Sequence, residues 1–291
     1  MNKTRVVVTG GNGQLGTELK KCSTDHPYLN FKFIDIEDLD ITDADAIKSY
    51  FNINRFDYLV NCAAYTAVDK AEEEPDMAFQ INAKAVQNII NSIRKEQTRL
   101  IHISTDYVFD GKGVEPYKEV SQTNPQSVYG KSKLEGEKAV QNYHPGMVIR
   151  TSWLYSSHSH NFVKSILKKG AVQKELRVVA DQVGTPTYAG HLAQAILAII
   201  DKVEKKITPF TAGIFHYTNE DSCSWYDFAV AIKEKAGLPC EIIPVKTEEF
   251  PLPAKRPFYS ILSKKKISTT YKLEIPHWKE GLKVCMEQIL R

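Results

Sequence analysis

The first half of the chain alternates short, β-branched apolar runs with longer segments of helical periodicity. We expect strands at Arg5–Thr9, Phe31–Ile36, Tyr58–Val60, Leu100–Ile103 and Met147–Ile149. We expect the intervening helices at Leu15–Cys22, Asp43–Phe51, Pro75–Lys95 and Ser127–Asn142. Short apolar strands that alternate with helices predict an α/β fold, in which a doubly wound, Rossmann-type parallel sheet is covered by helices on both faces.

Beyond Arg150 the alternation of strand and helix signals weakens. Helical patterns recur at Asn161–Lys169, His191–Val203 and Trp225–Ala236, and proline-rich loops separate them. We therefore expect a dinucleotide-binding domain at residues 1–152, completed by about 186–216. A smaller C-terminal substrate-binding lobe is expected at about 153–185 and 217–291.

The composition excludes several classes of protein. Hydrophobic residues make up 42% and charged residues 25%, as in an ordinary globular protein. A net charge of +3 without a basic stripe argues against nucleic-acid binding. Five cysteines without a Cys-x-x-Cys pair favour reduced thiols in a cytoplasmic protein over disulfides or a zinc site. No apolar run approaches the length of about 20 residues that a membrane helix needs.

A glycine cluster, Thr9–Gly16 (TGGNGQLG), follows the first expected strand and precedes the first helix. Both Gly11-x-Gly13-x-x-Gly16 and Gly10-x-x-Gly13-x-x-Gly16 match dinucleotide-binding spacings. Glycine permits the tight turn and lets backbone amides reach a pyrophosphate at the positive end of the helix. The cluster therefore predicts a nicotinamide dinucleotide site, and the alternative is a plain glycine-rich turn.

Two further segments fit the same cofactor. Asp35 ends the second strand about 20 residues downstream, where a carboxylate binds the adenosine ribose hydroxyls and favours NADH over NADPH. Asp40 and Ile41 are placed to frame the adenine. Asn61–Tyr65 follows the third strand, and its small residues let the backbone approach the cofactor. The alternatives are a solvent-exposed carboxylate and ordinary close packing.

Tyr129 and Lys133 lie four residues apart in an expected helix and so share one face. A nearby ammonium favours the phenolate, which predicts a lowered pKa for Tyr129 and a role in proton transfer. Lys133 is also expected to hold the nicotinamide ribose. On an ordinary helix the same pair would be a surface tyrosine beside a lysine, but the glycine cluster favours the catalytic interpretation.

Several residues near the expected site have two interpretations. Ser104 and Thr105 end the fourth strand and face opposite sides of the sheet, so one of them is expected to hydrogen-bond the reacting oxygen, although such residues also cap turns. Asn82 either binds a main-chain group or relays protons, or else is purely structural. Trp153 either packs on an uncharged ring or belongs to the core. Arg256 either binds a diphosphate bidentately or is solvated.

These motifs together resemble those of the extended short-chain dehydrogenase/reductases and, among them, the dTDP-4-dehydrorhamnose reductases. The finer similarity lies in Asn61–Glu72 (NCAAYTAVDKAE), Ser104–Gly111 (STDYVFDG), Arg150–Tyr155 (RTSWLY) and Asp181–Thr187 (DQVGTPT). Arg256-Pro257, Ser260 and Leu262 extend it, so it spans nearly the whole chain.

The resemblance implies that NADH or NADPH reduces the 4-keto group of dTDP-4-dehydro-β-L-rhamnose, the last step of dTDP-L-rhamnose synthesis for cell-surface polysaccharide. It implies that Tyr129 protonates the oxyanion, Lys133 tunes Tyr129 and Thr105 holds the same oxygen. Cofactor contacts are implied for Gly13, Gln14, Leu15, Asp35, Asp40, Ile41, Ala63, Ala64 and Tyr65. Substrate contacts are implied for Asp106 and Trp153, and further for Thr66 and Tyr107. Tyr65 stands where many members have histidine.

The resemblance leaves the oligomeric state and the competing functions open. Some members form magnesium-bridged homodimers, but no complete set of acidic ligands is evident here, so we expect no specific metal site. A dehydratase would need a glutamate directly after Thr105-Asp106, where this chain has Tyr107. An epimerase of another nucleotide sugar would retain its cofactor, and a regulatory subunit of methionine adenosyltransferase would lack catalysis. The set of Thr105, Tyr129 and Lys133 favours an enzyme.

Overall fold

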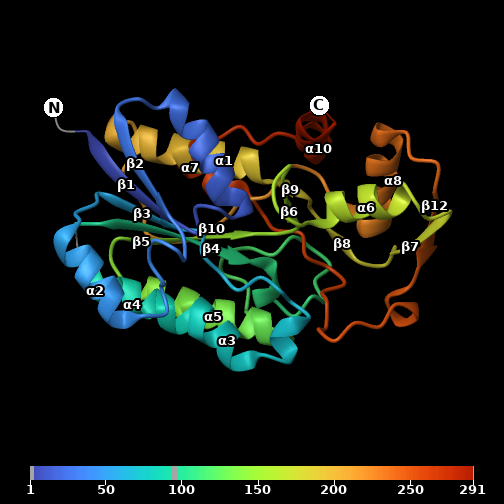
Figure 1. Ribbon diagram of the computed structural model, residues 1–291, viewed down its shortest axis with the longest axis horizontal. Coiled ribbons are helices and arrows are strands. Elements are labelled where there is room, and N and C mark those ends of the chain that lie inside the picture. The colour runs from blue at the N-terminus through green and yellow to red at the C-terminus, as the bar shows by residue number, and fades with distance from the viewer. Residues whose placement is uncertain (1–2, 94–96, 291) are drawn as a thin grey trace.

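The computed structural model describes residues 3–93 and 97–290. Within them, six parallel strands form one twisted sheet in the order β10-β5-β4-β3-β1-β2 (Figure 1). These strands are β1 (Thr4–Thr9), β2 (Leu29–Ile34), β3 (Tyr58–Asn61), β4 (Arg99–Thr105), β5 (Gly146–Thr151) and β10 (Gly213–His216). The strand order reverses between β1 and β3, which is where doubly wound sheets bind ligands. The predicted fold class is confirmed.

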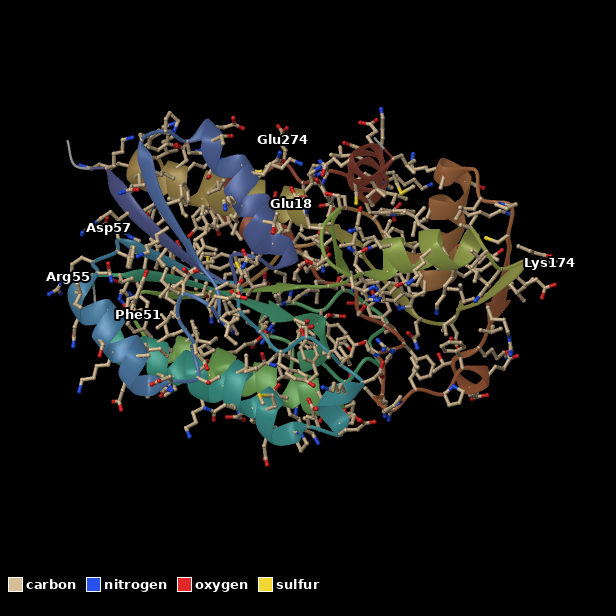
Figure 2. All side chains as sticks on the ribbon, in the orientation of Figure 1. Glu18, Phe51, Arg55, Asp57, Lys174 and Glu274 are labelled. Carbon is tan, nitrogen blue, oxygen red and sulfur yellow. The ribbon has the colours of Figure 1, made fainter. Side chains whose placement is uncertain are left out.

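Helices cover both faces of this sheet (Figure 1). On one face lie α1 (Gln14–Cys22) and α7 (Ala189–Glu204), which pack against each other. On the other face lie α2 (Ala44–Ile53), α3 (Pro75–Phe79), α4 (Ala85–Ser92) and α5 (Val128–Gln141). Because side chains alternate along a strand, Val6 and Val8 pack with the first layer and Val7 packs with the second. Side chains such as that of Phe51 fill the space between helices and sheet (Figure 2).

A second group of elements lies beyond the carboxyl edge of the sheet (Figure 1). It contains α6 (Phe162–Gly170), α8 (Trp225–Ala236), α10 (Trp278–Ile289) and three short strand pairs. The pairs are β6 (Leu154–Tyr155) with β9 (Thr187–Tyr188), β7 (Glu175–Val179) with β12 (Glu241–Val245), and β8 (Val183–Gly184) with β11 (Cys223–Ser224). These elements have their own hydrophobic cluster, which includes Phe228 and Leu282. Helix α9 (Lys265–Tyr271) instead packs next to β10.

Short polar side chains set the starts of several helices. The Asp43 carboxylate accepts hydrogen bonds from the backbone N–H groups of Asp45 (3.0 Å) and Ala46 (2.9 Å), so α2 begins at Ala44. Ser127 caps α5 through the N–H of Gly130 at 3.1 Å. The same logic starts α6 after Asn161 and α8 after Ser224. These caps explain why the predicted helix boundaries agree with the structure within a few residues.

The helix expected at Pro75–Lys95 is not continuous. It consists of α3, a π-helical turn η3 (Gln80–Lys84) and α4, which ends at Ser92, and its expected end at Lys95 lies outside the described residues. The π turn holds Asn82, whose side chain is fully buried. The expected strand at Phe31–Ile36 runs from Leu29 to Ile34 instead. Strand β10 and the helices α9 and α10 were not predicted.

Candidate active site

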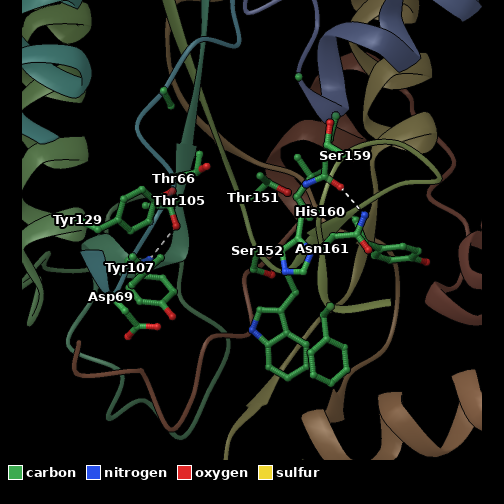
Figure 3. Close-up of a pocket in the computed structure, with 18 of the residues that line it drawn as sticks. Thr66, Asp69, Thr105, Tyr107, Tyr129, Thr151, Ser152, Ser159, His160 and Asn161 are labelled. Atoms are coloured by element: carbon green, nitrogen blue, oxygen red, sulfur yellow. Dashed lines mark hydrogen bonds between the residues drawn. The ribbon is translucent and has the colours of Figure 1, made fainter. Parts of the chain in front are cut away.

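A cavity of about 1590 Å³ opens at the carboxyl edge of the sheet and extends along the second group of elements. Figure 3 shows Thr105 and Tyr129 on one wall and His160 and Asn161 on the opposite wall. Apart from Tyr65, the cavity lining brings together all the residues that the sequence assigned to a site. They are Gly10, Gly13, Gln14, Leu15, Gly16, Asp35, Asp40, Ile41, Ala63, Ala64, Thr66, Thr105, Asp106, Tyr107, Tyr129, Lys133, Trp153 and Arg256.

The glycine cluster forms a tight loop between β1 and α1. Gly10 has a φ of +67°, and a Cβ atom there would lie 2.7 Å from the backbone nitrogen of Ala63. A Cβ atom on Gly16 would lie 2.2 Å from the Gly10 carbonyl oxygen. No other residue type fits either position without displacing backbone. The loop and the start of α1 line the cavity, which is where the glycine spacing predicted a dinucleotide phosphate.

Asp35 lies just beyond β2 and faces this loop. Its Oδ2 atom accepts a hydrogen bond from the Asn12 N–H at 2.7 Å, and its Oδ1 atom accepts one from the Ile36 N–H at 2.9 Å. Both bonds fix the carboxylate at the rim of the cavity, beside Asp40 and Ile41. A negative charge held here suits ribose hydroxyls and opposes a 2′-phosphate.

Gln14 is fixed from the opposite wall. Its Oε1 atom accepts hydrogen bonds from Ser156 Oγ at 3.1 Å and from Asn161 Nδ2 at 2.9 Å. These contacts tie the first turn of α1 to the start of α6. Sequence reasoning found Asn161 only as the start of a helix, because nothing local links it to a residue about 150 positions earlier.

Tyr129, Lys133 and Thr105 converge where β4 ends against α5. The Thr105 side chain interacts with the Tyr129 phenol, and its Oγ1 atom donates to Asp106 Oδ1 at 2.9 Å. Lys133 is 2% exposed, and its Nζ atom donates to the Ile103 carbonyl oxygen at 2.7 Å. A phenol, a hydroxyl and an ammonium group thus meet on one side of the cavity, which is the arrangement needed to protonate an oxygen atom.

Burial changes the acidity of these groups in opposite directions. It raises the pKa of Tyr129 well above its ordinary value, and neighbouring Asp106 and Tyr107 add to this, whereas the bond with Thr105 opposes it. Burial lowers the pKa of Lys133 to about 8, while Glu137 and Cys62 oppose the change. The lowered pKa that we expected for Tyr129 is therefore not found, because desolvation dominates and the Lys133 Nζ atom binds a carbonyl group.

Asp106 is a second buried acid in the same wall. It is 3% exposed, and burial raises its pKa to about 7 against the effect of its bond with Thr105. Its Oδ2 atom has no hydrogen-bond partner within the described residues. Asp106 lines the cavity, and Ser260 as well as Thr105 acts on its carboxyl group, so a buried carboxyl with a remaining acceptor atom is available for a ligand hydroxyl.

Arg256 lies in the proline-rich loop 250–258, which borders the cavity. Its Nη2 atom pairs with Asp69 Oδ2 at 2.6 Å, and its Nη1 atom donates to Tyr107 Oη at 3.1 Å. Arg256 is therefore paired and only partly exposed, which does not fit the interpretation as a solvated arginine. It links the loop to the segment after β3 and to the turn after β4.

Aromatic side chains form the wall of the cavity farthest from the sheet. Trp153 has a φ of 48° and stacks on Trp225, with ring centroids 3.5 Å apart. Phe162 lies against Trp225 at 4.6 Å. The sequence indicated Trp153 but not its two partners, since they come from α6 and α8 and share no motif with it.

Tyr65 points away from the cavity and donates to Glu74 Oε2 at 2.8 Å. Its backbone N–H and carbonyl both bond to the side chain of Asn82, at 2.9 and 3.1 Å. Asn82 also donates to Ser132 Oγ at 3.0 Å. Asn82 therefore binds a main-chain segment beside the cavity, one of the two functions that the sequence suggested for it.

Neither a metal centre nor a membrane span is found in the described part of the chain. Residues 3–93 and 97–290 contain no cluster of three or more His, Cys, Asp or Glu side chains able to hold a metal ion. No helix in these ranges has the length and apolarity to cross a membrane.

Comparison with known proteins gives consistent similarities over the full length. A family model described as "RmlD substrate binding domain" matches residues 4–291. The dTDP-4-dehydrorhamnose reductase of Aggregatibacter actinomycetemcomitans is 37% identical over 286 residues, covering 96% of this chain and 97% of that protein.

Two solved structures of similar proteins superpose closely. A dTDP-4-dehydrorhamnose reductase from Clostridium acetobutylicum has a TM-score of 0.91 and 42% identity, with 99% of this chain and 100% of the other covered. The dTDP-4-dehydrorhamnose reductase from Bacillus anthracis, solved in complex with NADP, has a TM-score of 0.90 and 38% identity, with 98% and 99% covered.

Proposed function

The chain belongs to the dTDP-4-dehydrorhamnose reductase family, and we propose that it reduces the 4-keto group of dTDP-4-dehydro-β-L-rhamnose to give dTDP-β-L-rhamnose. The observation that carries this proposal is the convergence of Thr105, Tyr129 and Lys133 in a cavity that also contains a glycine loop fitted to a dinucleotide. The lining of the cavity includes both that loop and Trp153 of the aromatic wall. One cavity can therefore hold the cofactor and the sugar nucleotide together.

The residues present fit a nicotinamide cofactor. The glycine loop has no room for a Cβ atom at Gly10 or Gly16, and Asp35 is held at the rim by two backbone N–H groups. When bound, NADH or NADPH supplies the hydride that the keto carbon accepts. Lys133 would bind the nicotinamide ribose, and Ala63 and Ala64 would allow the close approach of the backbone.

Tyr129 is the proton donor in this proposal. Its raised pKa keeps the phenol protonated at neutral pH, so it can deliver a proton to the substrate oxygen as that oxygen gains charge. Thr105 would donate to the same oxygen and help to stabilise the developing charge once its hydroxyl turns from Asp106 Oδ1, which accepts its proton in this structure. Lys133 is not among the groups that shift the Tyr129 pKa, so its task in this proposal is to hold the nicotinamide ribose beside the phenol.

The sugar and the nucleotide would occupy the rest of the cavity. Asp106 would bind a sugar hydroxyl through its unpaired Oδ2 atom, and Trp153 would pack on an uncharged ring. Thr66 and Tyr107 line the cavity close to these groups. Arg256 would bind the diphosphate only by exchanging its partner Asp69 for a phosphate group, since both of its terminal nitrogens are already bonded.

A coupled absorbance assay tests the proposed reaction. Purified protein, NADH or NADPH and dTDP-4-dehydro-6-deoxyglucose are mixed with or without the epimerase that makes the substrate. We expect cofactor oxidation that requires both the sugar and the epimerase and that yields dTDP-rhamnose. Cofactor binding without oxidation would instead favour an epimerase of another nucleotide sugar or a non-catalytic regulatory subunit.

Replacing the proton donor tests the role of Tyr129. We expect Tyr129→Phe to lower kcat by about 10²–10⁴-fold, the usual loss when general acid catalysis is removed. The affinity for NADH should stay close to that of the wild type, because the ring remains in place. Steady-state kinetics and NADH fluorescence titration measure the two effects. A fully active variant would show that Tyr129 is not the acid.

The pH dependence reports on Lys133. Its ammonium form is needed and its pKa is lowered to about 8, so kcat/KM for NADH should fall above this pH. Tyr129 adds no loss in the same range, since burial moves its pKa upward. Asp106, whose pKa burial raises to about 7, accounts for any change at lower pH. A profile that stays flat to about pH 9.5 would contradict this assignment.

The charge of Asp35 should set the preference between the two cofactors. We expect Asp35→Asn to raise the ratio of kcat/KM for NADPH over NADH by about tenfold, because repulsion of the 2′-phosphate is lost. Asp38→Asn is the matched control, since Asp38 is exposed, accepts the Asp35 N–H at 3.1 Å and lies outside the cavity lining. Equal ratios in the two variants would argue against Asp35 as the determinant.

A further inference from the structure

A stripe of three polar side chains runs along the sheet-facing side of α5. Tyr129, Lys133 and Glu137 follow one another at intervals of four residues, so they lie on one side of the helix. Tyr129 and Lys133 line the cavity, whereas Glu137 is fully buried one turn farther along and is not part of the lining. The proposed mechanism gives Glu137 no task.

Glu137 is held by a buried bidentate ion pair. Arg150 of β5 donates from Nε to Oε1 at 2.9 Å and from Nη2 to Oε2 at 2.6 Å, and it is 1% exposed. The guanidinium lies over the Phe109 ring at 5.0 Å. Its Nη1 atom is 3.5 Å from Nε2 of His216, whose pKa burial and Arg150 lower to about 3, so this imidazole is neutral.

An ion pair at this depth does little for stability by itself. Removing two charges from water costs about as much as their attraction returns, and apolar residues of similar size often stabilise a core equally well. The placement of this pair matters more, because its carboxylate lies one helical turn from the Lys133 ammonium. The Glu137 carboxylate therefore favours the charged form of Lys133.

The charges around Lys133 are few. The Cys62 thiol and the His102 imidazole interact with it, and burial keeps both neutral by raising the thiol pKa to about 12 and lowering the imidazole pKa well below its ordinary value. Asp106 lies in the same wall of the cavity, and Arg150 pairs with Glu137. Glu137 is thus the buried anion that offsets two buried cations, Lys133 and Arg150.

The same contacts fix the helix in space. Lys133 binds the Ile103 carbonyl group of β4, and Glu137 binds Arg150 of β5. Arg150 pairs in register with Ser104, the residue directly after Ile103. The two anchors, one and two turns behind Tyr129, therefore bind neighbouring strands at paired positions, and they oppose rotation and sliding of α5.

We propose that Glu137, held by Arg150, is a positioning residue that keeps Lys133 in its ammonium form and fixes α5 for proton transfer by Tyr129. This proposal rests on the proposed function only in that Lys133 acts on the cofactor as an ammonium group. It concerns which protonation state Lys133 adopts, and it does not depend on the identity of the sugar.

Glu137→Gln keeps the shape of the side chain and removes its charge. The test is how kcat/KM for NADH declines at alkaline pH in this variant, the alkaline limb of its pH profile. We expect the limb of kcat/KM for NADH to move to lower pH by about one unit or more, the effect of losing a close opposite charge. The double variant E137Q/R150M removes both charges of the pair. Its limb should move in the same direction by less, because a repelling cation is also lost.

Glu135→Gln is the matched control. Glu135 lies on the same helix and pairs with Lys138 at 2.6 Å, but both side chains are about half exposed. Its limb should coincide with that of the wild type. A purely structural role for Glu137 predicts lower thermal stability and an unmoved limb. The proposal would be overturned if either Glu137 variant, shown by circular dichroism to be folded, had the same alkaline limb of kcat/KM as the wild type.

A second readout separates this proposal from the choice of substrate. The dissociation constant of NADH, measured by fluorescence across the same pH range, should increase as Lys133 loses its proton. In Glu137→Gln this increase should occur at lower pH. This measurement needs no sugar. If the wild type fails to oxidise NADH with the dTDP sugar, the proposed substrate is wrong, yet the shift in NADH binding still decides the role of Glu137.

Discussion

Close approach between backbone segments is the constraint on which the site depends. A Cβ atom on Gly16 would lie 2.2 Å from the Gly10 carbonyl oxygen, and one on Gly130 would lie at the same distance from the carbonyl oxygen of Tyr107. Gly136 meets the carbonyl oxygen of Asn82 equally closely. These contacts set α1 against the loop after β1, and α5 against the turn after β4 and the π turn. The cofactor loop and the proton donor are therefore placed by backbone geometry before any ligand contact is made.

Desolvation then gives each polar group in the site a different task. The same burial that keeps Tyr129 protonated brings the pKa of Lys133 close to neutrality and raises that of Asp106 to about 7. An acid that holds its proton suits reduction, where a proton must be supplied. It suits oxidation less, because a phenolate base would be needed. The protonated phenol is thus the state from which the proposed reduction begins.

The sequence predicted the cofactor half of the molecule better than the substrate half, and the reason is physical. The glycine cluster, Asp35 and the pair Tyr129 and Lys133 are local patterns, and each depends on the geometry of one turn or one helix. The parallel order of the strands then brings them together. By contrast, the stacking of Trp153 on Trp225 joins segments with no common motif. The direction of the Tyr129 pKa change was also missed, since burial cannot be read from spacing.

Arg256 shows how such long-range contacts bear on function. Its ion pair with Asp69 is partly exposed, so exchanging that carboxylate for a phosphate group costs less than breaking a buried pair would. The bond to Tyr107 links the same guanidinium to the turn that follows Thr105. A change in the partner of Arg256 therefore acts on two walls of the cavity at once. It alters the charge that the diphosphate meets and the hold of loop 250–258 on the turn beside the proton donor. In the proposed function, Arg256 would thus take part in nucleotide recognition while contacting the turn beside the proton donor, whereas Glu137 and Arg150 lie at the opposite end of the stripe on α5.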